Sequence, residues 1–137
     1  MFRKLDDAVS VAGQISVDDV AEAARQGFVA IVNNRPDDEQ PGQPSGAEIE
    51  AAAKANGLSY RAIPITHAGF STNQVDAMVE ALSAAQGPLL AFCRSGTRST
   101  LVWALARGRI GDDPAELSDK AEAAGYDLTP VKAFIGK

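Results

Sequence analysis

The segment Leu-Leu-Ala-Phe-Cys-Arg-Ser-Gly-Thr-Arg-Ser-Thr, residues 89–100, decides the fold. Together with Pro88, its first four residues form a short apolar run, which is typical of a buried strand in a parallel sheet. The polar residues that follow predict a tight loop over residues 93–98. Residues 99–107 then predict a helix that ends near Gly108. A buried strand that passes through a short turn into a helix is the repeating unit of α/β proteins.

The same alternation continues in both directions from this segment. Apolar runs predict further strands within residues 8–15, at 28–32 and at 58–65. Capping signals predict helices that begin at Ser16, Ser45, Ser71 and Asp113, each followed by a glycine stop, and a short last helix that begins at Thr129. Strands alternating with helices of about ten residues predict an α/β fold with a mostly parallel central sheet flanked by helices.

Composition limits the functional classes. The chain has 137 residues, of which 45% are apolar and 23% charged, so we expect one domain over residues 1–137. Its net charge of −5 and the absence of a basic run argue against nucleic acid or an anionic membrane as partner. No signal peptide or membrane-length apolar stretch is present, so a cytoplasmic location is expected.

The chain has a single cysteine and a single histidine. One cysteine cannot form an internal disulfide, and a reducing compartment would keep its thiol available. The two residues do not make a structural metal site, so we expect neither metal nor cofactor.

The loop after residue 92 has the parts of an anion-binding cradle around Cys93. Successive backbone amides and the start of a helix supply donors and partial positive charge, and Gly96 permits a positive φ. The planar fork of Arg98 can hold two oxygens of a tetrahedral anion, and Ser99 can donate a hydrogen bond towards the sulfur. These features favour a Cys93 thiolate nucleophile. The predicted anion-binding residues are Arg94, Ser95, Gly96, Thr97 and Arg98.

Two other loops are expected beside this one, because ligands bind at the carboxyl ends of parallel strands. They are residues 33–44 and 66–70. In the second, His67 could act in catalysis or orient a ligand, although a solvated histidine is an equal alternative. In the first, Arg35 and Asp37 could form a wall of the site, and Asp37 or Asp38 could supply a proton.

Three sets of residues in or near these loops have structural interpretations. Residues 37–39 form an acidic run, which we expect to be a solvated loop tip. Asn33 and Asn34 are expected to serve the turn, and Trp103 is expected in the core.

The pattern Cys-x-x-Gly-x-Arg-Ser, at residues 93–99, resembles the active-site loop of single-domain rhodaneses. It also resembles the phosphate loop of tyrosine and dual-specificity phosphatases, which is one residue longer. Over nearly its full length, the chain resembles the phosphatase-like domain associated with beta-lactamase-hydrolase-like proteins, a bacterial family assigned to phosphatase or sulfurtransferase chemistry. That resemblance rests on residues 14–16, 34–37, 41–45, 103–105 and 124–128 together with the Cys93 loop. It implies a tyrosine/dual-specificity-phosphatase-like fold.

The chain departs from the phosphatase pattern in three ways. Four residues, not five, separate Cys93 from Arg98, and Ser99 takes the phosphatase arginine position. Phe92 stands where histidine is usual, and residues 66–70 lack the expected carboxylate acid. These departures favour sulfane-sulfur transfer from thiosulfate or a persulfide to a thiol acceptor. The alternative is hydrolysis of phosphate esters through phosphocysteine. A third hypothesis is a non-catalytic anion- or phosphoprotein-binding module, which would not need the sulfur.

Overall fold

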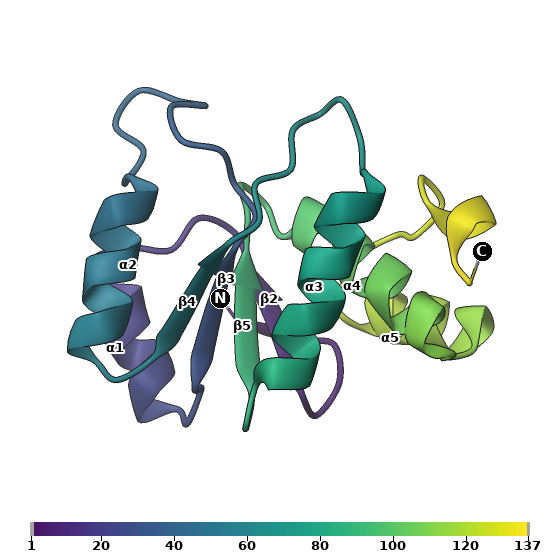
Figure 1. The fold of residues 1–137 in the computed structure, drawn as a ribbon, viewed down its shortest axis with the longest axis horizontal. Helices are drawn as coiled ribbons and strands as arrows, with labels where there is room; N and C mark the ends of the chain where they lie inside the picture. The colour runs from purple at the N-terminus through teal and green to yellow at the C-terminus, as the bar shows by residue number, and fades with distance from the viewer. Residues whose placement is uncertain (1, 137) are drawn as a thin grey trace.

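In the computed structural model, which describes residues 2–136, a five-stranded sheet has helices on both faces (Figure 1). The strands lie in the order β1-β2-β5-β3-β4. All neighbouring strands are parallel except β1 and β2, which are antiparallel. This confirms the predicted α/β fold with a mostly parallel sheet. The strands are β1 (Arg3–Lys4), β2 (Val9–Ala12), β3 (Ala30–Asn33), β4 (Ser59–Ala62) and β5 (Leu89–Phe92).

The central strand β5 divides two cores because its side chains alternate between the faces of the sheet. Leu89 and Ala91 pack with α3, α4 and α5, whereas Leu90 and Phe92 pack with α1 and α2. Burial on both faces explains why the strand is apolar throughout. The helices are α1 (Val17–Arg25), α2 (Gly46–Ala55), α3 (Thr72–Ala84), α4 (Thr97–Ile110) and α5 (Pro114–Ala123), with a last 3₁₀ turn η1 (Lys132–Phe134).

Three predicted helix starts have complete capping boxes. The hydroxyls of Ser16, Ser45 and Ser71 each accept from the backbone amide three residues later, and the side chain at that position accepts from the serine amide in return. Each box satisfies two amides that would otherwise lack a partner at a helix start. Local sequence therefore sets where α1, α2 and α3 begin.

Several elements differ from the prediction. Helix α4 begins at Thr97, two residues before the predicted start, and runs to Ile110 through Gly108, which was expected to end it. The last helix, predicted from Thr129, is the 3₁₀ turn η1. Gly108 is buried, and a Cβ atom there would collide with Ile135, so this glycine allows close packing of the C-terminal segment. Strand β1 was not predicted, because it has two exposed residues and no apolar pattern. The core position expected for Trp103 is confirmed.

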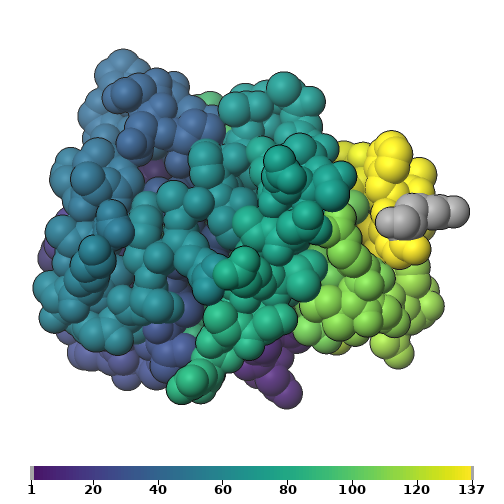
Figure 2. Space-filling view, viewed as in Figure 1, coloured from purple at the N-terminus to yellow at the C-terminus, as the bar shows by residue number. Residues whose placement is uncertain are grey.

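The predicted loops lie together at the carboxyl ends of the parallel strands. Residues 34–45 follow β3, residues 63–71 follow β4, and residues 93–96 join β5 to α4. In the space-filling view, the segment near residue 40 and the segment near residue 70 rise on either side of a notch (Figure 2). Within residues 2–136, no helix has both the length and the apolar character needed to span a membrane.

Candidate active site

Cys93 lies at the end of β5, beneath the turn that leads into α4. Its backbone amide donates to Ala12 O at 3.3 Å, and the amide of Gly96 donates to the Cys93 sulfur at 3.1 Å. Gly96 is the N-cap of α4 with φ of 90°, the left-handed conformation predicted for it. Cys93 exposes no surface to solvent, so its sulfur is held under the turn.

The carbonyl groups of the turn have partners elsewhere in the protein. Gln14 N donates to Arg94 O at 3.3 Å, Tyr126 Oη donates to Ser95 O at 3.0 Å, and the amide and hydroxyl of Thr100 both donate to Gly96 O. In a trans peptide the N–H points opposite to the C=O. The amide of Gly96 is therefore directed away from Tyr126, and it donates to the Cys93 sulfur.

Tyr126 supports the turn from the segment after α5. A Cβ atom at position 96 would collide with the Tyr126 hydroxyl, so the ring lies directly against the glycine. Burial, as the largest cause, raises the pKa of Tyr126, which keeps its hydroxyl protonated as a donor to Ser95 O. The guanidinium of Arg3 lies 5.5 Å from the centre of the same ring. Long-range packing thus holds the shape of the turn.

Arg98 extends from the first turn of α4 to Glu39, in the loop after β3. Its Nη1 donates to Glu39 Oε2 at 2.7 Å and its Nη2 to Glu39 Oε1 at 2.9 Å, so the carboxylate is held by two parallel bonds. Nη1 also donates to Ile65 O at 2.6 Å. The contact with Glu39 raises the pKa of Arg98 most, and the nearby Cys93 raises it as well. Arg98 is therefore a fixed positive charge beside the sulfur.

Glu39 also receives a hydrogen bond from buried Arg35, whose Nε lies 2.8 Å from Oε1. The hydrogen bond from Arg98, followed by that from Arg35, lowers the pKa of Glu39 to about 2 despite the opposing effect of burial. Glu39 therefore remains ionised at neutral pH. The expectation of a fully solvated acidic loop tip is wrong for this residue, whose side chain is only 18% exposed.

Ser99 does not make the contact expected of it. Its hydroxyl donates to Asn34 Oδ1 at 2.7 Å, and Asn34 Nδ2 donates to Ile63 O at 3.0 Å. The Ser99 proton is therefore directed at the β3 loop, not at sulfur. The pair joins the start of α4 to the ends of β3 and β4, which agrees with the structural interpretation of Asn34.

A pocket of about 550 Å³ opens beside the turn, between it and the loop after β4. His67 lines it together with Arg94, Ser95, Thr97 and Arg98, so the structure brings these predicted residues to one cavity. Asp37 is directed elsewhere, since its Oδ1 accepts from Gly46 N at 2.8 Å at the start of α2. Within residues 2–136, no three His, Cys, Asp or Glu side chains come together to hold a metal ion.

Three side chains near the turn were not predicted as functional. Glu39 fixes Arg98, Gln14 accepts from Arg35 at 3.1 Å, and Tyr126 supports Ser95. One signal could have identified Glu39: it lies four residues after Arg35, within a loop already placed beside the site. Tyr126 has no local signal, because its partner is 31 residues away.

The chain matches the family model described as "Beta-lactamase hydrolase-like protein, phosphatase-like domain" over residues 1–110. It is 32% identical over 135 residues to a beta-lactamase hydrolase-like protein of Agrobacterium fabrum, a match that covers 96% of this chain and 31% of that protein. The chain thus spans about a third of the length of the curated relatives it matches.

Among solved structures, a protein of Neisseria meningitidis described as a candidate phosphatase is 30% identical, with a TM-score of 0.83 and coverage of 96% and 93% of the two chains. Tk-PTP has a TM-score of 0.77 at 20% identity, with coverage of 98% and 92%. Pseudomonas aeruginosa TpbA, solved in complex with phosphotyrosine, has a TM-score of 0.63 at 18% identity, with coverage of 99% and 90%. The last two show the fold alone.

These comparisons support the phosphatase alternative and give no support to sulfur transfer or to a rhodanese-like activity. The fold is that of tyrosine and dual-specificity phosphatases, as the resemblance in the sequence implied. The cysteine-bearing turn lies within the 110 residues that the family model matches. The chain belongs to the family of phosphatase-like domains of beta-lactamase hydrolase-like proteins.

Proposed function

We propose that the chain is a cysteine-dependent phosphatase that hydrolyses phosphate monoesters. The observation that carries the proposal is the position of the Cys93 sulfur, which accepts from the Gly96 amide at the start of α4 and lies beside a fixed arginine. A tetrahedral anion fits such a turn, because the amides and the start of α4 supply donors and partial positive charge. The family of the chain supports a phosphate ester over thiosulfate.

One edge of the Arg98 guanidinium group is available to bind the substrate. Of its five N–H bonds, three are engaged by Glu39 and Ile65. The N–H of Nε and the second N–H of Nη2 form the remaining side edge, which can hold two phosphate oxygens. Glu39 is thus a positioning residue: it holds one edge of Arg98 and orients the other.

The proposed reaction has two steps through a covalent intermediate. The Cys93 thiolate attacks phosphorus, an S–P bond forms, and the P–O bond to the organic group breaks. The leaving oxygen takes a proton from an acid on the protein. Water then attacks the phosphocysteine, the S–P bond breaks, and inorganic phosphate leaves as the thiolate is restored.

His67 is the proposed acid, since Glu39 and Asp37 are engaged otherwise and Asp38 does not line the pocket. Glu39 stays ionised between two arginines, and Asp37 accepts from Gly46 N. His67 lines the pocket that Arg98 also lines, where the leaving group would lie. It would protonate the leaving oxygen in the first step and take a proton from water in the second.

The burial of Cys93 has a consequence for this reaction. Because the residue exposes no surface, the turn or the loops beside it must open as substrate enters. Iodoacetamide can measure this opening, since Cys93 is the only cysteine and its alkylation is read directly from intact mass. We expect inorganic phosphate to slow alkylation, because an anion in the cradle blocks approach to the sulfur.

The deciding experiment is turnover of a panel of aryl and alkyl phosphates by the wild type and by Cys93→Ser, with Asp119→Asn, at an exposed position of α5, as control. We expect Cys93→Ser to abolish turnover and Asp119→Asn to leave it unchanged. For alkyl phosphates, which have poor leaving groups, His67→Asn should lower kcat at least tenfold. Turnover that survives in Cys93→Ser would overturn the proposal.

Sulfane-sulfur transfer remains a second candidate on one observation, the four-residue spacing between Cys93 and Arg98. Intact mass after incubation with thiosulfate or glutathione persulfide separates the two chemistries. One added sulfur on the wild type, absent from Cys93→Ser and removed by cyanide, together with no phosphatase turnover, would favour transfer. Binding of anions without either reaction would favour a binding module.

A further inference from the structure

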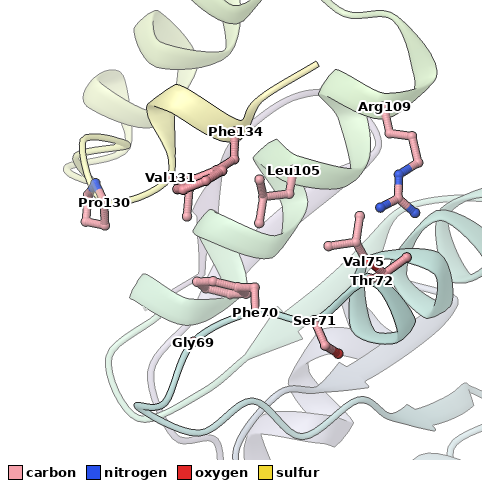
Figure 3. A pocket seen from close by; sticks show the side chains of 10 residues that line it. All are labelled: Gly69, Phe70, Ser71, Thr72, Val75, Leu105, Arg109, Pro130, Val131 and Phe134. Atoms are coloured by element: carbon pink, nitrogen blue, oxygen red, sulfur yellow. The ribbon is translucent and has the colours of Figure 1, made fainter. Parts of the chain in front are cut away.

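A second pocket, of about 370 Å³, adjoins the candidate active site (Figure 3). Its lining is mainly apolar, with Phe70, Leu105, Val131 and Phe134 around it. It shares Gly69 and Phe70 with the pocket that Arg98 lines, so the same short loop forms a wall of both. The volume lies within the range of pockets that bind small molecules, about 300–1,000 Å³.

One face of α4 runs from the first pocket to the second. Arg98 and Leu101 line the pocket at the turn, and Leu105 and Arg109 line the apolar pocket. These four positions are spaced by three, four and four residues, which places them on one side of a helix. At 1.5 Å per residue, Leu105 lies roughly 10 Å along the helix from Arg98.

Phe134 stands at this pocket with 65% of its surface exposed, the most exposed large apolar side chain among the described residues. Arg109, at the far end, is paired with Asp76, so the residues that line this pocket present no unpaired cation for another anion. The pocket therefore suits an uncharged, apolar group, and burying such a group would also remove the Phe134 ring from water.

We infer that the pocket binds the apolar part of the substrate whose phosphate occupies the Cys93 turn. The substrate class is then a phosphate monoester with an alkyl or aryl group that extends roughly 10 Å from the phosphate, along the Leu101–Leu105 face of α4. This inference rests on the proposed function, since it takes the anion at Arg98 as the other end of the same molecule. Small phosphates such as phenyl phosphate would fill only the first pocket.

The test is calorimetric binding of a series of n-alkylphosphonates, from methyl to decyl, below the concentrations at which they form micelles. Phosphonates keep the anionic head and resist hydrolysis. Short members should bind alike, and each methylene that enters the apolar pocket should tighten binding up to about fourfold. The heat-capacity change should become more negative over the same range, as apolar burial requires.

Phe134→Ser and Leu105→Asn probe the pocket itself. Both should remove most of the gain with chain length and leave methylphosphonate affinity within twofold of the wild type. Phe134 is exposed, so Phe134→Ser keeps the test valid should Leu105→Asn fail to fold. Ile110→Ser is the matched control, because Ile110 is 48% exposed and does not line the pocket.

The outcomes separate this inference from the proposed function. Methylphosphonate binding with no gain for longer chains, or a gain unchanged in Phe134→Ser and Leu105→Asn, would overturn the inference alone. A gain in affinity with chain length that Phe134→Ser and Leu105→Asn remove, together with no Cys93-dependent turnover of any phosphate ester, would support the binding geometry and overturn the phosphatase proposal. Absence of binding by every phosphonate would overturn both.

Discussion

Replacing Glu39 with glutamine tests whether one carboxylate holds the two buried arginines of the site. Glutamine keeps the size of the side chain and removes its charge. Arg35 and Arg98, whose side chains are 3% and 9% exposed, would then lie side by side without an anion between them. Removal of one partner from a buried ion pair leaves an uncompensated charge, which destabilises the folded state.

The magnitude follows from the pKa of Glu39, which is lowered from 4.5 to about 2. That difference corresponds to about 3 kcal/mol of free energy of unfolding at neutral pH. Because Glu39 has the lower pKa in the folded state, its contribution is complete above pH 4.5. It is lost as the pH falls through about 2, below which the carboxylate is protonated in both states.

Urea unfolding followed by circular dichroism measures this contribution at several pH values. We expect Glu39→Gln to be less stable than the wild type by about 2–3 kcal/mol at pH 7. This difference in the free energy of unfolding should fall by pH 3 to less than half of its value at pH 7. The other carboxylates are common to both proteins and cancel in the difference.

Asp38→Asn is the matched control, since Asp38 is the exposed neighbour in the same loop and asparagine tolerates its φ of 62°. It should change the free energy of unfolding by less than about 0.5 kcal/mol at either pH. A gap between wild type and Glu39→Gln that is absent at pH 7, or equally large at pH 7 and pH 3, would refute the reasoning from the ion pairs.

Three further substitutions test the turn and the C-terminal packing. Gly96→Ala should abolish turnover, because alanine at φ of 90° is strained by roughly 1–2 kcal/mol and its Cβ would collide with Tyr126. The check is alkylation of Cys93 by iodoacetamide, which inorganic phosphate should no longer slow in this variant. Tyr126→Phe should cost about 1 kcal/mol in urea unfolding and speed alkylation of Cys93, and unchanged alkylation would contradict its role at the turn. Gly108→Ala should lower stability by about 1–3 kcal/mol through its collision with Ile135, with the midpoint of thermal unfolding as the measurement.

The parts of the site that depend on nearby residues could be predicted. Cys93 follows an apolar strand, Gly96 permits a positive φ in the turn, and Arg98 lies next to the start of the following helix. Each of these follows from residues within one turn of chain, where spacing and conformational preference act directly. The mostly parallel sheet followed in the same way, from the regular alternation of strands with capped helices.

The partners of those residues could not be predicted from local pattern. Arg98 meets Glu39, 59 residues away; Ser99 meets Asn34, 65 residues away; and Ser95 meets Tyr126, 31 residues away. The expectation that Ser99 would face the sulfur was wrong because its hydroxyl donates to Asn34, in the loop after β3. An acidic run in sequence gave no sign that its third member would lie between two buried arginines.

The amino-acid sequence alone determines that a single cysteine ends a buried strand beneath a helix start, because capping, glycine conformation and apolar periodicity act over a few residues. The tertiary structure alone determines that the Arg98–Glu39 pair and the Tyr126 ring lie at the turn that holds this cysteine. The strand order β1-β2-β5-β3-β4 places β5 between β2 and β3, and so brings the loop of Glu39 and the segment of Gln14 against the turn. Strand order arises from packing of the whole chain, which no short stretch of sequence contains.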